Sequence, residues 1–424
     1  MLAHVLQAVR EVGPRAICVV YGSGGEQVRS ALPGADLCWA KQEVLLGTGD
    51  ALKCGLEHLP KDGVTLAMIG DLPLIRPETL SRLAAAVDGD VLAVLTATPP
   101  DPSGLGRIVR DGAGRICEIV EDKDASPEQL AIGEINTGVL AAPTERFAKW
   151  LARLDRDNAQ GEYYLTGVVA LAVADGVPVV AVPASDAMEV QGVNDRAQLA
   201  AVERTLQKQA AGALLRDGVT LADPARIDVR GTLQCGTDVA IDINCIFEGS
   251  VTLGDAVSIG AHCLLNNVKV GAGSVVAPFS HIENAEIGGR CRIGPYSRIR
   301  PASVLADEVH IGNFVEVKAS TIGIRSKANH LAYVGDASVG RDVNIGAGTI
   351  TCNYDGVNKH RTIIEDDVQI GSDTQLIAPV TVRKGATIGA GATISREVPG
   401  GGLTISHNKQ VTVPGWKRPV KVER

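Results

Sequence analysis

The sequence has few aromatic residues, no long hydrophobic run and no excess of basic residues. Phe, Trp and Tyr make up 3% of the 424 residues, although hydrophobic residues together reach 45%. A core must therefore be built from aliphatic side chains, and a disordered chain, which lacks them, is excluded. The net charge of −8 argues against non-specific nucleic-acid binding, which needs a basic surface. No apolar run reaches ~18 residues, so no membrane-spanning helix is expected.

Neither a signal peptide nor a disulfide framework is indicated. The first residues, Met1 to Val5, lack both a basic segment and a long apolar stretch. The nine cysteines are widely spaced, odd in number and include no C-x-x-C pair. This spacing favours reduced thiols over disulfides or a zinc site. We therefore expect a cytoplasmic protein with no membrane or nucleic-acid partner.

The first half of the chain alternates helical and strand patterns. Residues 2–12 and 77–87 have apolar residues at helical spacing, whereas 16–20, 64–69 and 91–95 are short apolar runs that end near glycines. Strands that alternate with helices predict an α/β domain with a Rossmann-like, mostly parallel sheet and helices on both faces. Ligands of such sheets bind at the carboxyl ends of the strands.

Aliphatic residues recur about every six positions in the second half. The members are Leu253, Ile259, Leu265, Val270, Val276, Ile282, Ile287, Ile293, Ile299, Leu305, Ile311, Val317 and Ile322, then Ile364, Ile370, Leu376, Val382, Ile388 and Ile394. This period fits neither a helix nor an alternating strand and is the hexapeptide signature of a parallel β-helix. A Gly-rich antiparallel sandwich would not keep the register for so long. The narrow coils should leave no room inside for Phe or Trp.

These patterns divide the chain into three parts. We expect an α/β domain over 1–195, a linker helix over 196–218, where apolar residues recur at helical spacing, and the β-helix over 219–424.

Polar residues concentrate in one stretch of the β-helix. The segments are Gly312–Lys318, Asn329–Asp336, Asn344–Thr349 and Cys352–Gly356. Residues 353–360 break the repeat and should form a loop that projects from the coil. A β-helix alone implies no activity, so this stretch is the guide to function.

These segments resemble bacterial bifunctional enzymes that make UDP-N-acetylglucosamine. Such enzymes join a glucosamine-1-phosphate N-acetyltransferase to an N-acetylglucosamine-1-phosphate uridyltransferase, and the likeness extends over nearly the whole chain. It implies an α/β nucleotidyltransferase domain followed by a left-handed parallel β-helix. It also implies a homotrimer and three substrates, namely UTP, glucosamine-1-phosphate and acetyl-CoA.

The resemblance assigns the acetyltransferase site. His330 would be the general base that takes a proton from the substrate amine, a role that suits an imidazole. The sugar phosphate would be bound by Arg300, Lys318, Tyr333, Asn344 and Lys359, and acetyl-CoA by Ala347, Asn353, Tyr354, Ser372, Ala390 and His407. The family usually has Arg at the position of His407, and an imidazole should bind a phosphate less firmly.

The resemblance also assigns a uridyltransferase site in the first half. Its residues would be Gln42, Gly47, Thr48, Gly70, Asp71, Gly106, Glu121, Asn136 and Asn194. Asp71 and Asn194 would bind Mg²⁺, which prefers oxygen ligands.

The family opens with a strand and a glycine-rich nucleotide loop that this sequence does not contain. About one strand–loop–helix unit, roughly 30 residues, precedes the position that matches Met1. We therefore expect Met1 to be an internal methionine, and we expect acetyl transfer but little uridyl transfer from the chain as written.

Two other functions remain open from the sequence. The chain could be another sugar-1-phosphate nucleotidyltransferase with a β-helix tail, such as the ADP-glucose type. It could also be a non-catalytic assembly protein built on the same two folds. Neither alternative would need the polar segments around His330 and Asn353.

Overall fold

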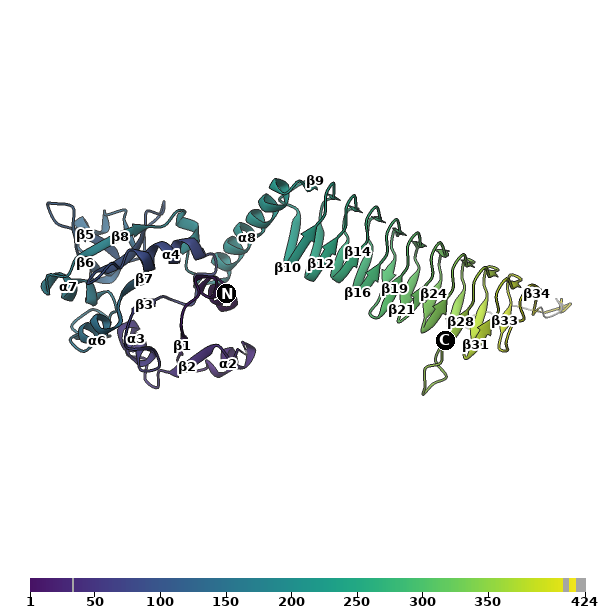
Figure 1. Ribbon diagram of the computed structural model, residues 1–424, viewed down its shortest axis with the longest axis horizontal. Coiled ribbons are helices and arrows are strands. Elements are labelled where there is room, and N and C mark those ends of the chain that lie inside the picture. The colour runs from purple at the N-terminus through teal and green to yellow at the C-terminus, as the bar shows by residue number, and fades with distance from the viewer. Residues whose placement is uncertain (33, 407–411, 417–424) are drawn as a thin grey trace. The chain divides into compact units, whose positions relative to one another are not determined.

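The computed structural model describes residues 1–32, 34–406 and 412–416. The chain divides into two compact units, Met1–Leu206 and Gln207–Arg424 (Figure 1). None of the helices in the described ranges is both long and apolar enough to cross a membrane.

The first unit is an α/β domain (Figure 1). Its helices are α1 (Leu2–Val12), α2 (Glu26–Ala31), α3 (Thr48–Leu56), α4 (Pro77–Ala85), η1 (Asp122–Asp124), α5 (Pro127–Leu130), α6 (Thr144–Leu151), α7 (Gly167–Ala174), η2 (Ala187–Val190) and the first part of α8 (Arg196–Arg216). Its strands are β1 (Ile17–Tyr21), β2 (Leu37–Lys41), β3 (Val64–Ala67), β4 (Leu92–Ala97), β5 (Arg107–Arg110), β6 (Ile116–Val120), β7 (Ile135–Pro143) and β8 (Val179–Pro183). The strands and helices expected from the alternating patterns are therefore present.

The strands of the first unit form two sheets. Strands β1 and β2 pair in parallel as a two-stranded sheet, and the other six form a sheet with the order β6-β5-β7-β4-β8, in which β3 also pairs with β7. Strands β3, β4, β5 and β8 run in one direction, whereas β6 and β7 run in the other. Most strands are thus parallel in direction, as expected. The long strand β7 nevertheless lies between β3 and β4 and is antiparallel to both. Strands β4 and β8 are neighbours that pair in parallel.

Helices cover both faces of the six-stranded sheet. Along β4, Leu92 and Val94 belong to a core with Phe147 and Trp150 of α6, whereas the intervening residues belong to a second core with Leu80 of α4. The alternation follows from the two-residue period of a strand. Both faces of β4 are therefore buried, which explains its continuous apolar run.

The second unit is a parallel β-helix that begins after α8 (Figure 1). One face contains β9 (Thr220–Leu221), β11 (Ala240–Ile241), β13 (Ser258–Ile259), β15 (Val275–Val276), β17 (Arg292–Ile293), β20 (His310–Asn313), β23 (Lys327–His330), β26 (Asn344–Ile345), β29 (Gln369–Ile370), β32 (Thr387–Ile388) and β34 (Leu403–Thr404). The longer strands β10 (Ile227–Cys235), β12 (Cys245–Leu253), β14 (Leu264–Val270) and β16 (His281–Ile287) begin the other sheet. That sheet then continues as two series of shorter strands. The first series is β18 (Arg298–Ile299), β21 (Glu316–Lys318), β24 (Tyr333–Gly335), β27 (Ile350–Cys352), β30 (Gln375–Ile377) and β33 (Thr393–Ile394). The second series is β19 (Ser303–Leu305), β22 (Thr321–Ile322), β25 (Ala337–Val339), β28 (Thr362–Ile364) and β31 (Val380–Val382).

The six-residue repeat forms the interior of the coils. Every repeat residue named in the sequence analysis is at most 4% exposed, so the aliphatic repeat lines the interior of the coils, as the hexapeptide pattern predicts. The expectation that no aromatic residue fits inside is wrong for Phe247, which is buried on the long strand β12. Outside the coil, the rings of His262, Phe279, Tyr296 and Phe314 stack on one another at successive corners.

One coil is interrupted by a loop. Ser258 pairs with Val275, 17 residues later, whereas Asn344 pairs with Gln369, 25 residues later. The added residues form the loop expected over 353–360, which projects from the coil (Figure 1). Helix α8 occupies most of the segment expected as a linker, and its C-terminal part packs Ala211 and Leu214 into the β-helix core. The domain boundaries at 195 and 218 remain predictions.

Candidate functional sites

The imidazole of His330 lies at a corner of the β-helix and is exposed. Strand β23 ends at His330, whose register partner on the preceding coil is Asn313. The Asn313 Oδ1 lies 2.8 Å from His330 Nδ1. An amide oxygen can only accept, so Nδ1 donates in this contact, and in the neutral imidazole Nε2 is then the nitrogen that carries the lone pair. The pair thus leaves a proton acceptor at the surface.

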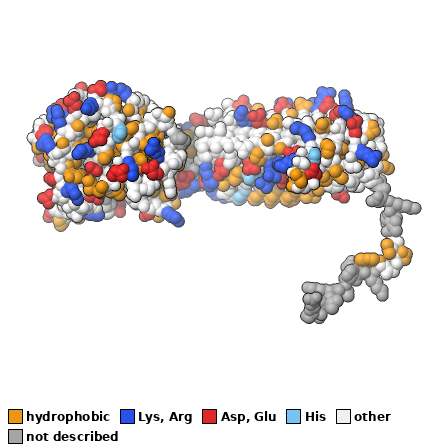
Figure 2. Space-filling model, turned by 90° about the horizontal axis from the view of Figure 1, so that it is seen from below, with side chains coloured by type: hydrophobic (Ala, Val, Ile, Leu, Met, Phe, Trp, Pro, Cys, Tyr) orange, Lys and Arg blue, Asp and Glu red, His pale blue; other side chains and the backbone are white. Residues whose placement is uncertain are grey.

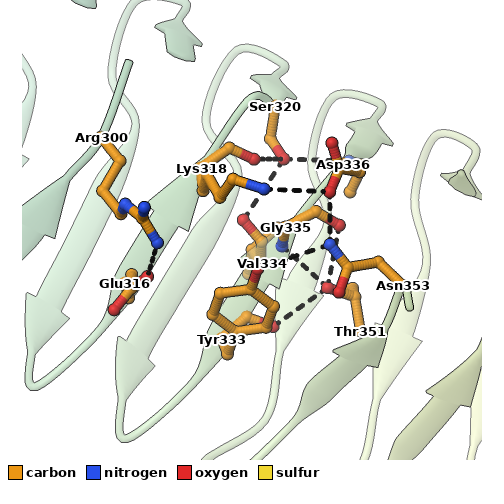
Figure 3. A network of polar contacts seen from close by, with 11 residues as sticks. Arg300, Glu316, Lys318, Ser320, Tyr333, Val334, Gly335, Asp336, Thr351 and Asn353 are labelled. Carbon is orange, nitrogen blue, oxygen red and sulfur yellow. Dashed lines mark hydrogen bonds and ion pairs between the residues drawn. The ribbon is translucent and has the colours of Figure 1, made fainter. Parts of the chain in front are cut away.

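Basic side chains of two successive coils, Arg300 and Lys318, are paired with carboxylates (Figure 3). Arg300 Nη1 donates to Glu316 Oε1 at 2.9 Å, and Lys318 Nζ lies 3.4 Å from Asp336 Oδ2. The Arg300 Nε is buried without a hydrogen-bond partner. An unsatisfied buried donor of this kind fits an anionic ligand.

Lys359 adds a further cation from the projecting loop. The pKa of Lys359 is lowered because its amino group lies within hydrogen-bonding reach of the positively charged Lys318. The pKa of Lys318 is raised by the same contact and by Asp336. Two amino groups this close repel when both are charged, so a bound phosphate would stabilise both.

The loop that carries Asn353 and Tyr354 begins inside this group. The Asn353 amide, only 8% exposed, donates to Asp336 and lies 3.4 Å from the Tyr333 hydroxyl (Figure 3). Tyr354 is exposed and pairs across the loop with Lys359. The loop is therefore anchored to the coil at Asn353, while Tyr354 extends into solvent.

The small residues assigned to acetyl-CoA stack on consecutive coils. Asp373 N–H donates to the Ala347 carbonyl and Gly391 N–H to the Ser372 carbonyl, so these turns and that of Ala390 follow one another. Asn344 lies one coil after Lys327 on the same face. His407 lies outside the described residues.

Three residues assigned to the sugar in the first unit are brought together. The Asn136 N–H donates to the Gly106 carbonyl at 2.8 Å, and a Cβ atom on Gly106 would lie 3.3 Å from Glu121 Oε2. Burial raises the pKa of Glu121, although Thr166 donates to its carboxylate at 2.9 Å. A buried carboxylate next to a glycine provides a hydrogen-bond acceptor in a space that a side chain would fill.

A second group surrounds the start of α3. The buried Gln42 Nε2 donates to the Gly47 carbonyl at 3.2 Å and to Asp50 Oδ2 at 2.7 Å. Gly47 has a φ of +108°, and a Cβ there would lie 2.7 Å from the Tyr163 carbonyl oxygen. Only glycine fits this close approach. Thr48 accepts a hydrogen bond from the backbone of Leu165.

Asp71 follows β3 and Gly70 and has a partly buried carboxylate. Its Oδ1 is buried without a hydrogen-bond partner, and burial raises the pKa of the group. A Cβ atom added to Gly192 would lie 3.5 Å from Asp71 Oδ2, so the Gly192–Asn194 segment passes close to this carboxylate. The Asn194 side chain itself is exposed. An orphaned carboxylate oxygen is suited to Mg²⁺, which uses few protein ligands and adds substrate phosphates.

The sequence reasoning missed three residues of the β-helix site. Asn313, Glu316 and Asp336 lie inside the polar segments, but no role was given to them. The signal that could have found them is the coil length, because residues about 17 positions apart lie side by side. Subtracting one coil from His330 and from Asn353 leads to Asn313 and Asp336.

Comparison with known proteins covers both units. A family model for the MobA-like NTP transferase domain matches residues 1–217, one for the GMPPB C-terminal domain matches 229–329, and six bacterial transferase hexapeptide repeats match 361–396. The chain is 58% identical over 421 residues to the bifunctional protein GlmU of Chromobacterium violaceum, covering 99% of this chain and 92% of that protein. The chain belongs to the bifunctional GlmU family. The GlmU proteins of an Azoarcus species (58% identity, 99% and 93% coverage) and Ralstonia pickettii (56%, 100% and 93%) are similarly close.

Membership of the GlmU family confirms the function implied by the resemblance. The chain is a bifunctional enzyme of UDP-N-acetylglucosamine biosynthesis, with an N-acetyltransferase and a uridyltransferase activity. The second unit is the left-handed β-helix of this family. The two alternatives, a different nucleotidyltransferase and a non-catalytic protein, are thereby excluded. A nucleotidyl transferase from Methanothermobacter thermautotroptrophicus aligns over 51% of this chain and 81% of that one, at 21% identity and a TM-score of 0.34, which is too distant to support an argument.

Proposed function

We propose that acetyl transfer takes place at the corner of the β-helix that carries His330. The observation that carries this proposal is the Asn313–His330 pair, which leaves Nε2 of the neutral imidazole as a proton acceptor on the same stretch of coils as Arg300 and Lys318. The amine of glucosamine-1-phosphate attacks the thioester carbon of acetyl-CoA, His330 takes the amine proton, and the coenzyme leaves as its thiolate. Arg300, Lys318 and Lys359 bind the phosphate, together with Tyr333 and Asn344.

Acetyl-CoA would lie along the coils that follow. Ala347, Ser372 and Ala390 lie at one corner of consecutive turns, and the loop that Asn353 anchors to the coil carries the exposed Tyr354, which would contact the same substrate. Small side chains at this corner leave room for the coenzyme. His407 would contact its phosphates.

Uridyl transfer would take place on the first unit. Gln42, Gly47 and Thr48 bind the nucleotide, and Gly106, Glu121 and Asn136 bind the sugar, with Gly70 at the strand end. Asp71 and Asn194 would hold Mg²⁺, which neutralises the phosphate charge that develops during transfer. Figure 2 shows acidic and basic side chains interspersed on one face of this unit, a polar surface that is compatible with a charged substrate.

We also propose that the protein is a cytoplasmic homotrimer. Phe314 and Leu331 are 56% and 63% exposed and immediately follow Asn313 and His330. Apolar side chains exposed beside a polar site favour contact with a further copy of the chain. The nine cysteines are free, which supports a reducing compartment.

The two sites predict a crosswise pattern of loss. Lys318→Met should lower kcat/KM of acetyl transfer by about 10- to 100-fold, because a charged contact to the phosphate is lost, and should leave uridyl transfer unchanged. Asp71→Asn should lower whatever uridyl transfer is measured for the unchanged chain, because a ligand of Mg²⁺ is lost, and should leave acetyl transfer unchanged. Both half-reactions are measured on each purified variant. Loss of both activities in either variant would contradict two separate sites.

A further inference from the structure

Asp336 lies between two groups of the proposed acetyltransferase site. It follows β24 at a corner of the coil with a φ of +49°, and its backbone N–H donates to the Lys318 carbonyl at 3.0 Å. Its own carbonyl accepts from Thr362 N–H at 3.2 Å. The residue is thus held by backbone contacts to the coils on both sides.

The carboxylate of Asp336 contacts side chains from both neighbouring coils. Its Oδ2 lies 3.4 Å from Lys318 Nζ on the preceding coil and accepts a hydrogen bond from the Asn353 amide on the following coil (Figure 3). Lys318 and Asp336 have side chains only 18% and 22% exposed, and Asn353 is buried. One oxygen therefore joins a residue assigned to the sugar phosphate to a residue assigned to acetyl-CoA.

We propose that Asp336 is a positioning residue that fixes Lys318 and Asn353 relative to each other, so that the sugar amine meets the thioester. This inference rests on the proposed acetyl transfer at His330. Asp336 touches neither substrate in this account. It acts through the two side chains that it holds. Because these side chains keep a fixed position, the substrates that they bind are held with their reacting groups close together.

Local charge explains why a carboxylate is needed there. Lys318 lies beside Lys359, and Arg300 also faces this pair, while Glu316 is occupied with Arg300. Asp336 is the carboxylate that faces the two lysines. Without its charge, the lysines would separate by repulsion before the substrate binds.

The Asn353 amide has one other tether. The Tyr333 hydroxyl lies 3.4 Å from the same Asn353 nitrogen, a longer contact than that to Asp336. Thr351 Oγ1 accepts from the Gly335 N–H at 2.7 Å and thereby fixes the strand end next to Asp336. The contacts of Lys318 and Asn353 should therefore both weaken when the charged carboxylate is replaced by a neutral amide, because hydrogen bonds to an ionised acceptor are roughly twice as strong as those to a neutral one.

Asp336→Asn is the informative substitution because Asn also adopts a positive φ readily. The charge is lost while the corner is kept. Asp342 provides a matched control, since it has a φ of +57° at another corner and pairs with Arg325 at 2.7 Å. Asp342→Asn removes the same charge from the same backbone conformation, at a residue with no assigned role in either substrate site.

The test is steady-state acetyl transfer by the full chain, with each substrate varied in turn. Asp336→Asn should lower kcat/KM for both glucosamine-1-phosphate and acetyl-CoA by about 10- to 100-fold, while Asp342→Asn stays within about twofold of the unchanged protein. In a double-mutant cycle, adding Asp336→Asn to Lys318→Met should lower kcat/KM by clearly less than Asp336→Asn does alone, because the Lys318 contact is already absent and only the Asn353 contact remains to be lost.

Each other outcome overturns the inference. Unchanged kinetics in Asp336→Asn, a loss confined to one substrate, or additive losses in the double variant would show that Asp336 does not couple the two groups. If Asp336→Asn does not fold, Asn353→Ala replaces it in the cycle with Lys318→Met, and additive losses there have the same meaning. If Lys318→Met itself leaves acetyl transfer unchanged, the proposed site is wrong, which separates that failure from the failure of this inference.

Discussion

The contact between Asn313 and His330 gives the sharpest prediction about proton transfer. The two atoms lie 2.8 Å apart, and both side chains are on the outside of the coil. Asn313→Ala removes the acceptor that holds the proton on Nδ1. The imidazole is then free to rotate and to exchange its proton between the two nitrogens, so that Nε2 is less often available as the base.

The size of the effect follows from the exposure of the pair. A hydrogen bond that water can replace contributes about 1 kcal/mol, rather than the larger value of a buried charged contact. Each ~1.4 kcal/mol corresponds to a tenfold change in rate. We therefore expect kcat of acetyl transfer to fall by roughly 3- to 20-fold, with the KM of both substrates within about twofold.

The assay is steady-state acetyl transfer at saturating substrates, followed by release of the coenzyme thiol. Asn244 provides the control, because its amide nitrogen lies 3.4 Å from His262 Nε2, an asparagine–histidine contact between two successive coils outside the proposed site. Asn244→Ala should have unchanged kcat. An Asn313→Ala variant with unchanged kcat, or one in which only KM rises, would refute the assignment of Asn313 to the orientation of His330.

Three other substitutions test local parts of the account. Gly312→Ala should lower thermal stability and acetyl transfer together, because the added Cβ would overlap the Asn329 carbonyl. Gly402→Ala is the control and should change neither, because a Cβ at Gly402 meets no atom within 4 Å. Ile299→Ala should lower the free energy of unfolding by about 2–5 kcal/mol, since Ile299 is fully buried in the coil, as urea denaturation would measure. Glu121→Gln should stabilise the first unit at pH 8 but not at pH 3. Burial raises the pKa of Glu121, so the charged carboxylate lowers the stability of the folded state only once the pH has risen through the pKa of the folded state. Unfolding of both proteins at the two pH values measures the difference.

The β-helix was largely predictable, because its repeat is a local property of the sequence. A six-residue period specifies which side chains face inward, and every repeat residue named from the sequence is buried. Phe247 was not anticipated, since nothing in its own segment distinguishes an interior position from an exterior one. The stacked rings of Phe279 and Tyr296 likewise follow from positions one coil apart, a spacing that the six-residue pattern alone does not emphasise.

Strand order in the first unit could not be predicted from local patterns. The apolar residues of β7 resemble those of β4, yet β7 runs in the opposite direction between β3 and β4. Direction depends on the path of the connections, which hydrophobic periodicity does not encode. The site partners were missed because they are also non-local. His330 and Asn353 were predicted from their own segments, whereas their partners Asn313 and Asp336 lie one coil away.

The central claim is that His330 is the base of acetyl transfer on the β-helix, and replacement of this one side chain tests it most directly. His330→Ala should lower kcat by at least about 100-fold, as expected for loss of a general base, while the melting temperature of the protein is unchanged. His281→Ala, at a partly exposed histidine of an earlier coil whose ring lies 3.8 Å from Glu283, should retain full activity. If His330→Ala transfers acetyl groups within about threefold of the unchanged protein, the assignment of this site is contradicted.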